Sequence, residues 1–154
     1  MPTTFVKGDL FETPGIRAYA HGCNCAGAMG AGIAVAFKKR WPRMFEEYAV
    51  RCADGRFRLG DVFVWNEGEV VVYNLATQEH WKTKARLPAL KVAAKKMVEL
   101  AAAVGVERIG LPRIGAGLGG LEWGRVKSLL GEIGEQTPVT LVVFEQFVRA
   151  GKAP

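Results

Sequence analysis

The chain has 154 residues, of which 49% are apolar and 23% are charged, proportions typical of one soluble globular domain. No run approaches 18 consecutive apolar residues, so the sequence excludes a transmembrane helix. Its 21 Lys and Arg against 15 Asp and Glu favour polyanionic partners such as nucleotides or nucleic acid, or mark only a basic solvated surface.

Cysteine usage and the first residues indicate the compartment. Cys23 and Cys25 are too close together for an ordinary zinc pair, and Cys52 stands alone, so we expect reduced thiols and no metal. The segment 1–5 has neither the basic nor the long apolar region of a signal peptide. These features predict a cytoplasmic protein, which we expect to be a monomer without a bound cofactor.

Hydrophobic periodicity and helix breakers divide the chain into alternating strands and helices. Apolar residues between 87 and 104 recur at alternating spacings of three and four, which predicts one amphipathic helix that ends at Gly105. Trp41-Pro42 separates two further helices, because Pro is well placed in a first helical turn. The expected strands are 4–7, 16–23, 62–65, 70–75, 108–111 and 139–144, and the expected helices are about 32–40, 42–54, 87–104 and 122–136.

This order of elements predicts an α/β fold, a three-layer α/β/α sandwich with helices on both faces of the sheet. The segment 62–75 has the pattern of a hairpin of β-branched and aromatic residues, so the sheet is expected to be mixed rather than purely parallel. We expect a single domain, 1–154, with a core of about 4–145 and a C-terminal tail over 146–154.

Two glycine-rich loops dominate the functional interpretation. Residues 115–120 hold four glycines between an expected strand and an expected helix, and residues 24–32 occupy the equivalent place after an earlier strand. Glycine lets the backbone approach a ligand, and successive N–H groups at a strand-to-helix turn bind anions. In an α/β sheet both loops would lie beyond the carboxyl ends of the strands, where ligands bind. Two facing loops suit a diphosphate, although a lone glycine loop is equally often a plain turn. Neither loop has the P-loop pattern, and residues 24–32 lack the dinucleotide fingerprint.

Other polar residues have two interpretations each. Asp9 at a strand end is a turn former or an acceptor for an exocyclic amine, and turn chemistry is the commoner role. His21, just before the first loop, is a buried structural residue or a site residue. The polar segment 76–84 leaves a strand and has no period, a setting that often carries function.

Several motifs together resemble the macrodomain family. They are Lys7-Gly8-Asp9-Leu10-Phe11, Gly22-Cys23-Asn24, Met29-Gly30-Ala31-Gly32-Ile33-Ala34 followed by Phe37-Lys38, Tyr73-Asn74-Leu75 with Thr77, and Pro112-Arg113-Ile114-Gly115-Ala116-Gly117-Leu118 with Leu121-Glu122-Trp123. The motifs occur in order and span nearly the whole chain. The Met-Gly-x-Gly-Ile-Ala loop and the Leu-x-Trp ending are similar to the branch with terminal ADP-ribose protein glycohydrolase and DarG-type DNA ADP-ribosyl glycohydrolases, and His80-Trp81 also resembles the DarG type.

The resemblance implies a mixed sheet between helices and a cleft for ADP-ribose. It implies that Asp9 accepts the adenine amine with Leu10 beside the ring, that Phe144 stacks on adenine, and that Asn24 faces the distal ribose. The two loops would hold the diphosphate and distal ribose through N–H groups. The expected ligand-binding residues are Asp9, Leu10, His21, Asn24, Met29, Gly30, Ala31, Gly32, Ile33, Thr77, Gln78, Arg113, Ile114, Gly115, Ala116, Gly117, Leu118, Gly119 and Phe144.

Two departures from the branch concern catalysis. A Lys thought to act on the anomeric carbon is replaced by Gln78, which cannot form an imine, and a glycohydrolase Asp is replaced by Gly119, as in the DarG type. The first hypothesis is an ADP-ribosyl hydrolase that cleaves a bond to an acidic side chain or to a nucleobase of thymidine type. Its catalytic candidates are Glu79, His80, Lys82 and Lys84.

Among these candidates, His80 suits acid–base work because histidine is the residue type that most readily exchanges a proton near neutral pH. The competing interpretation is that His80-Trp81 packs to hold the loop in place. A second hypothesis is a reader that binds ADP-ribose or its adducts without turnover, and a third is a binder of RNA or poly(ADP-ribose), which lacks an aromatic-and-basic stripe. We favour the enzyme narrowly, with ADP-ribosylated protein or DNA as its partner.

Overall fold

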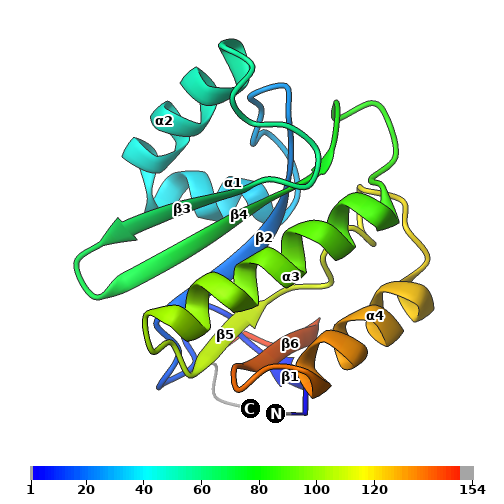
Figure 1. Ribbon diagram of the computed structural model, residues 1–154. Coiled ribbons are helices and arrows are strands. Elements are labelled where there is room, and N and C mark those ends of the chain that lie inside the picture. The colour runs from blue at the N-terminus through cyan, green and yellow to red at the C-terminus, as the bar shows by residue number, and fades with distance from the viewer. Residues whose placement is uncertain (1, 150–154) are drawn as a thin grey trace.

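The protein is an α/β sandwich around one six-stranded sheet (Figure 1). The computed structural model describes residues 2–149. The strand order is β1-β6-β5-β2-β4-β3, and all neighbouring pairs are parallel except β3 with β4. The strands are β1 (Thr4–Gly8), β2 (Ala18–Asn24), β3 (Val62–Glu67), β4 (Val70–Gln78), β5 (Arg108–Leu111) and β6 (Thr140–Phe147). The predicted mixed sheet is therefore confirmed.

Helices cover both faces of the sheet, as predicted. On one face α3 (Leu87–Ala103) and α4 (Trp123–Glu135) pack into a core cluster with the strands, and Figure 1 shows the two helices side by side. The second cluster holds α1 (Ile33–Arg40) and α2 (Pro42–Ala53) against the other face. These two clusters make the three layers that the alternation of elements predicts.

The central strand β2 shows how the sequence supplies both layers. Successive side chains of a strand point to opposite faces. Ala18 and Ala20 belong to the cluster under α3 and α4, whereas Tyr19 and Cys23 belong to the cluster under α1 and α2. Because both faces of the strand are covered, most of its residues are apolar, and its polar side chains His21 and Asn24 are buried as well.

The parallel strands bring four chain exits to one edge of the sheet. β6, β5, β2 and β4 are consecutive neighbours and run in the same direction. The first glycine loop, 25–32, leaves β2, and the second, 112–122, leaves the adjacent β5. The two loops are therefore neighbours in space although about 90 residues apart in sequence.

Several predicted strand boundaries are wrong, among them the end of β3, which lies at Glu67 rather than at residue 65. β6 continues to Phe147 and pairs with Lys7 and Gly8 of β1, so the tail cannot begin at Gln146. β4 continues to Gln78, past the predicted end at residue 75, because it pairs with β2 along its length. β2 begins at Ala18 rather than at residue 16. In each case pairing with a neighbouring strand of the sheet decides the bounds. Residues 150–154 of the predicted tail lie outside the described residues.

Among the described residues, no helix is long and apolar enough to cross a membrane. The three cysteines are free thiols, as expected.

Candidate functional site

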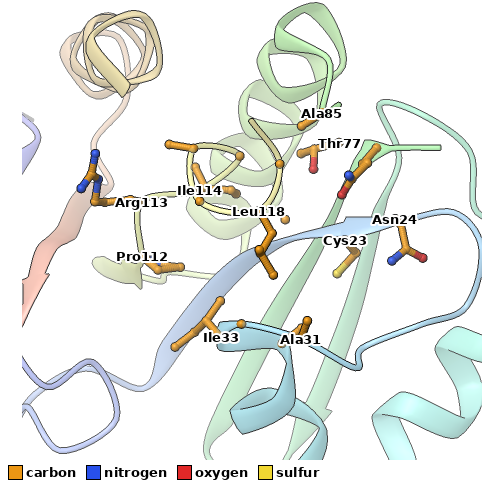
Figure 2. A pocket seen from close by; sticks show the side chains of 18 of the residues that line it. Cys23, Asn24, Ala31, Ile33, Thr77, Ala85, Pro112, Arg113, Ile114 and Leu118 are labelled. Carbon is orange, nitrogen blue, oxygen red and sulfur yellow. The ribbon is translucent and has the colours of Figure 1, made fainter. Parts of the chain in front are cut away.

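A pocket of about 880 Å³ opens at the edge of the sheet where the parallel strands β6, β5, β2 and β4 end. This volume lies in the range of sites for small ligands. Its two long walls are the glycine loops after β2 and β5 (Figure 2). The site is thus built where parallel sheets ordinarily bind ligands, beyond the carboxyl ends of the strands.

Side-chain hydrogen bonds hold the first glycine loop in shape. Asn24 Oδ1 accepts the N–H groups of Ala26 and Ala28 at 3.0 and 3.3 Å, and Asn24 Nδ2 donates to the Ala28 carbonyl at 2.9 Å. From α2, the Tyr48 hydroxyl lies 2.7 Å from the Asn24 carbonyl oxygen and 2.9 Å from Asn24 Oδ1. The Asn24 side chain is therefore turned into the loop that it organises.

The second glycine loop is shaped by its own backbone. The N–H groups of Ala116 and Leu121 donate to the carbonyls of Arg113 and Gly115. Gly115 has a φ of 74°, which favours glycine. A Cβ on Gly119 would lie 2.6 Å from the Gly115 carbonyl oxygen, so this position requires glycine as well.

Unpaired N–H groups gather where the two loops face each other. Within the described chain, the N–H groups of residues 30–32 and 117–119 donate to no other protein group. A Cβ on Gly30 or Gly117 would meet nothing within 4 Å. Such clusters of exposed N–H groups at strand-to-helix turns bind anionic oxygens, and a pair of them can bind two phosphates of one ligand.

The two loops also touch directly. The Leu118 side chain comes within 3.3 Å of the position that a Cβ on Gly32 would occupy. Figure 2 shows Leu118 extending from the second loop toward Ala31 and Ile33. Although Leu118 crosses the cleft in this way, 74% of its surface is exposed. A ligand that enters between the loops must displace or pack against this side chain.

Each end of the pocket carries aromatic side chains. Phe144 and Phe147 line the end at β6, and Trp81 lines the end at β4 with Gln78 and Thr77. Since neighbouring strands lie about 4.8 Å apart, three strand spacings separate these ends by about 14 Å. The pocket is therefore elongated, with flat apolar surfaces at its ends and N–H groups in its middle.

Comparison with known proteins places the chain in a family. The sequence profile of the Macro domain matches residues 20–130. The chain belongs to the Macro domain family. It is 33% identical over 132 residues to a DNA ADP-ribosyl glycohydrolase of Thermus aquaticus, an alignment that covers 83% of this chain and 36% of that protein. The chain thus spans little more than a third of the length of such relatives.

Two other relatives match over most of their length. The human ADP-ribose glycohydrolase OARD1 is 32% identical over 141 residues, which cover 92% of this chain and 90% of that one. The macrodomain of Mycobacterium tuberculosis DarG superposes with a TM-score of 0.85 at 29% identity, covering 92% and 95% of the two chains. The predicted resemblance to the branch that contains these two kinds of glycohydrolase is confirmed.

Most of the residues predicted to bind the ligand line the pocket of this macrodomain. They are Asn24, Met29, Gly30, Ala31, Gly32, Ile33, Thr77, Gln78, Arg113, Ile114, Gly115, Ala116, Gly117, Leu118, Gly119 and Phe144. Asp9, Leu10 and His21 do not line it. The motifs around the two glycine loops therefore locate the walls, and the three exceptions all lie on or beside strands.

His21 is a core residue of the macrodomain. Its ring is fully buried and stacks on Phe37 with centroids 3.8 Å apart. Asn74 Nδ2 donates to the Phe63 carbonyl, so Asn74 Oδ1 is the acceptor that faces His21 Nε2 at 2.6 Å. Burial lowers the pKa of His21 to about 4, which keeps the imidazole neutral at pH 7. His21 is therefore a buried structural residue rather than a residue of the site.

Asp9 and Leu10 lie just outside the β6 end of the pocket. Asp9 Oδ1 accepts the Phe11 N–H at 3.3 Å, which is the turn chemistry that the sequence suggests. Leu10 is buried against Gly110 of β5. The neighbouring Gly8 faces the Phe144 ring at 3.3 Å, measured from the position of a Cβ, so Asp9 follows directly on a residue in contact with the pocket wall.

The segment after β4 forms a compact turn at the other end. The Gln78 side-chain amide donates to the Thr83 carbonyl, and His80 Nδ1 accepts the Lys82 N–H at 3.2 Å. The His80 ring stacks on Trp81 with centroids 3.7 Å apart. Of these residues, Gln78 and Trp81 line the pocket.

None of the four catalytic candidates lines the pocket. Glu79 lies 3.5 Å from Arg86 in an exposed ion pair. The Lys84 stem packs beside Gly120, and Lys82 is exposed. The His80 ring stacks on Trp81, and of the two residues only Trp81 lines the pocket. All four nevertheless belong to the turn that closes the β4 end of the pocket.

Sequence reasoning missed several residues of the pocket wall, namely Gly22, Cys23, Ala28, Ala34, Trp81, Ala85, Pro112, Glu145 and Phe147. Most of them flank predicted positions. Trp81 could have been predicted to line the pocket, because a large aromatic side chain is unusual in a polar segment without periodicity and indicates a contact with a ligand. Phe147 could not, because its place depends on the extension of β6.

Proposed function

We propose that this macrodomain binds ADP-ribose between its two glycine loops and hydrolyses the bond that joins the ribose C1″ to a modified protein or nucleic acid. The observation that carries the proposal is the pair of loops whose unpaired N–H groups face each other across one elongated pocket. Relatives named ADP-ribosyl glycohydrolases support the same activity.

The proposed pose follows the shape of the pocket. Adenine lies at the β6 end on Phe144, with its amine toward Asp9. The diphosphate lies between the loops, and the distal ribose lies near Thr77 and Gln78. Asn24 acts on the ribose indirectly, since its amide is already bonded within the first loop. The bond to be cleaved therefore points toward the turn at residues 79–84.

The adenine end of this pose has its own test. Asp9→Ala should weaken ADP-ribose binding by roughly 1–3 kcal/mol, the usual cost of removing one partner from a buried polar group. Glu12→Ala is a matched control, because Glu12 is an exposed acid on the same turn. Titration calorimetry measures both variants. An Asp9→Ala variant with wild-type affinity would remove Asp9 from the adenine site.

In the proposed hydrolysis, a water oxygen bonds to C1″ and gives up one proton, while the bond from C1″ to the leaving atom breaks with its electron pair and the leaving atom gains a proton. The Gln78 amide is engaged with Thr83 and supports the turn rather than the chemistry. The groups proposed to orient water or supply the proton are Glu79, His80, Lys82 and Lys84, which lie on this turn. We further propose a monomeric, cytoplasmic enzyme that needs no metal, so chelation with EDTA should leave its rate unchanged.

A reader without turnover is the second candidate, and one observation favours it. Within the described chain, the titratable side chains that line the pocket are Cys23, Arg113 and Glu145. Arg113 follows β5 and Glu145 lies on β6, so both side chains are away from the β4 end of the pocket. Burial raises the pKa of the Cys23 thiol well above its ordinary value, so this group supplies neither acid nor base at pH 7.

A release assay distinguishes the two candidates. The substrates are protein ADP-ribosylated on glutamate and DNA ADP-ribosylated on thymidine, with free ADP-ribose followed by mass spectrometry and binding measured in the same samples. Release from either substrate, lost in one of the variants Glu79→Gln, His80→Gln, Lys82→Gln or Lys84→Gln, supports the enzyme. Tight binding of both substrates without release supports the reader.

A further inference from the structure

Trp81 is an exposed aromatic side chain with a fixed place in the pocket. More than half of its surface, 53%, is open, yet it lines the pocket beyond the end of β4. Large exposed apolar side chains in a pocket wall are typical of contact surfaces for a ligand. The proposed pose leaves Trp81 uncontacted by ADP-ribose itself, because the distal ribose ends beside Thr77 and Gln78.

The turn around Trp81 holds the indole ring in place through stacking and hydrogen bonds. His80 covers one face of the indole at 3.7 Å with planes 29° apart, and it does not line the pocket itself. Two hydrogen bonds fix His80, one from the Lys82 N–H to Nδ1 and one from the Thr83 hydroxyl to the His80 carbonyl. His80 thus covers one face of the Trp81 ring and leaves the rest of the side chain exposed at the pocket wall.

The indole ring of Trp81 favours contact with a planar group of the ligand. The face of an aromatic ring stacks well on a planar heterocycle such as a nucleobase, whereas the ester that joins an acidic side chain to ribose has no ring to stack. Stacking of a base on an aromatic side chain is tolerant of sequence and strong for its size. The exposed Lys82 and Lys84 on the same turn suit the phosphates that flank a base.

From these observations we propose that Trp81 is a specificity-determining residue, which stacks on the nucleobase joined to ribose C1″ and so selects ADP-ribosylated nucleic acid over ADP-ribosylated acidic side chains. This inference rests on the proposed function, because it assumes ADP-ribose in the pocket. Adenine on Phe144 and the modified base on Trp81 would then occupy the two aromatic ends, with the diphosphate between the loops.

The test compares Trp81→Ala and Trp81→Phe with the wild type on three ligands: free ADP-ribose, a thymidine-linked ADP-ribosyl oligonucleotide and a glutamate-linked ADP-ribosyl peptide. Trp81→Ala should lower kcat/KM on the oligonucleotide by about 5- to 150-fold more than on the peptide, the range expected for one lost stacking contact. Trp81→Phe should recover most of that loss, because it retains a flat ring.

Phe147→Ala is the control at the opposite end of the pocket, where both substrates present the same adenosine. It should lower kcat/KM on the oligonucleotide and on the peptide by the same factor. An equal loss on both substrates in Trp81→Ala, or no loss on the oligonucleotide, would overturn the proposal.

Failure of the proposed function gives a different pattern. If the wild type releases ADP-ribose from neither substrate, hydrolysis is wrong, and the ratio of the Kd values for the oligonucleotide and free ADP-ribose then decides the role of Trp81. A ratio that changes at least about fivefold in Trp81→Ala supports the stacking contact, and an unchanged ratio rejects it.

Discussion

The two glycine loops of the pocket are stabilised in different ways. Side chains hold the first loop, through Asn24 at the end of β2 and Tyr48 on α2. The second loop depends on the absence of side chains, because a Cβ on Gly119 would collide with the Gly115 carbonyl oxygen and a Cβ on Gly115 would collide with the Leu121 side chain. The two loops thus present similar rows of N–H groups, although one is held by side-chain hydrogen bonds and the other by glycines that lack side chains. Substitutions should therefore affect the two loops differently.

The largest effect is expected for Gly117→Val in the second loop. A Cβ here meets no protein atom, so the fold should persist, but the branched side chain would occupy the space that phosphate needs. Loss of two charge-assisted hydrogen bonds of about 1.5–3 kcal/mol each corresponds to a fall in ADP-ribose affinity of about 100-fold or more. Calorimetry measures the affinity, and thermal unfolding checks the fold.

Gly131→Val in α4 is the matched control for Gly117→Val, because a Cβ there is also unhindered and the residue lies outside the pocket. It should bind ADP-ribose like the wild type. Normal binding by a folded Gly117→Val variant would show that the second loop does not hold the phosphates.

The strand that carries the first loop should be sensitive to acid. The folded-state pKa of His21, about 4, lies below its ordinary value of 6.5, so the unfolded chain binds a proton that the folded protein excludes. His21 therefore costs no stability above pH 6.5, and stability falls as the pH drops from 6.5 toward 4. The loss should reach about 3 kcal/mol.

Urea unfolding of the wild type and of His21→Gln between pH 7 and 4 isolates this contribution, since carboxylates titrate in both proteins. The wild type should lose stability more steeply. Parallel curves for the two proteins would mean that the imidazole is protonated without unfolding.

Gly119→Ala probes the close approach within the second loop. The added Cβ would lie 2.6 Å from the Gly115 carbonyl oxygen and 3.1 Å from Ala85 Cβ, so the loop must move. We expect a loss of unfolding free energy of about 1–3 kcal/mol, the usual cost of overpacking, together with weaker ADP-ribose binding. Gly117→Ala, which adds the same methyl group in open space, should keep the stability of the wild type in the same urea titration.

The smallest effect is expected for Tyr48→Phe, which tests the side-chain support of the first loop. It removes one hydroxyl, and Asn24 Oδ1 keeps its bonds from the N–H groups of Ala26 and Ala28, so the cost should be about 1 kcal/mol. ADP-ribose affinity should fall as the loop loosens. Tyr19→Phe removes a buried hydroxyl that donates to the Ile16 carbonyl, away from the pocket, and should affect stability alone.

Absence of any change in affinity in Tyr48→Phe would mean that Asn24 and its neighbours hold the first loop without help from α2. Both loops would then be stabilised from within, without support from a neighbouring helix.

Local patterns in the sequence determined the order of elements, the mixed sheet, the two loops and most of the pocket wall. The 3–4 stripe of α3 and the Trp41-Pro42 break depend on neighbours in sequence, so they can be recognised without the fold. The glycine motifs likewise carry their own conformational signature, and they sufficed to indicate the family.

Tertiary structure alone decided how the polar side chains are used. His21 became a core residue because Phe37 covers it, Asn24 turned into its own loop because Tyr48 approaches from α2, and Trp81 became a wall because His80 supports it. Strand ends at Gln78 and Phe147 were set by partner strands. The physical reason is common to all of these: the direction of a side chain and the end of a strand depend on atoms that are distant in sequence.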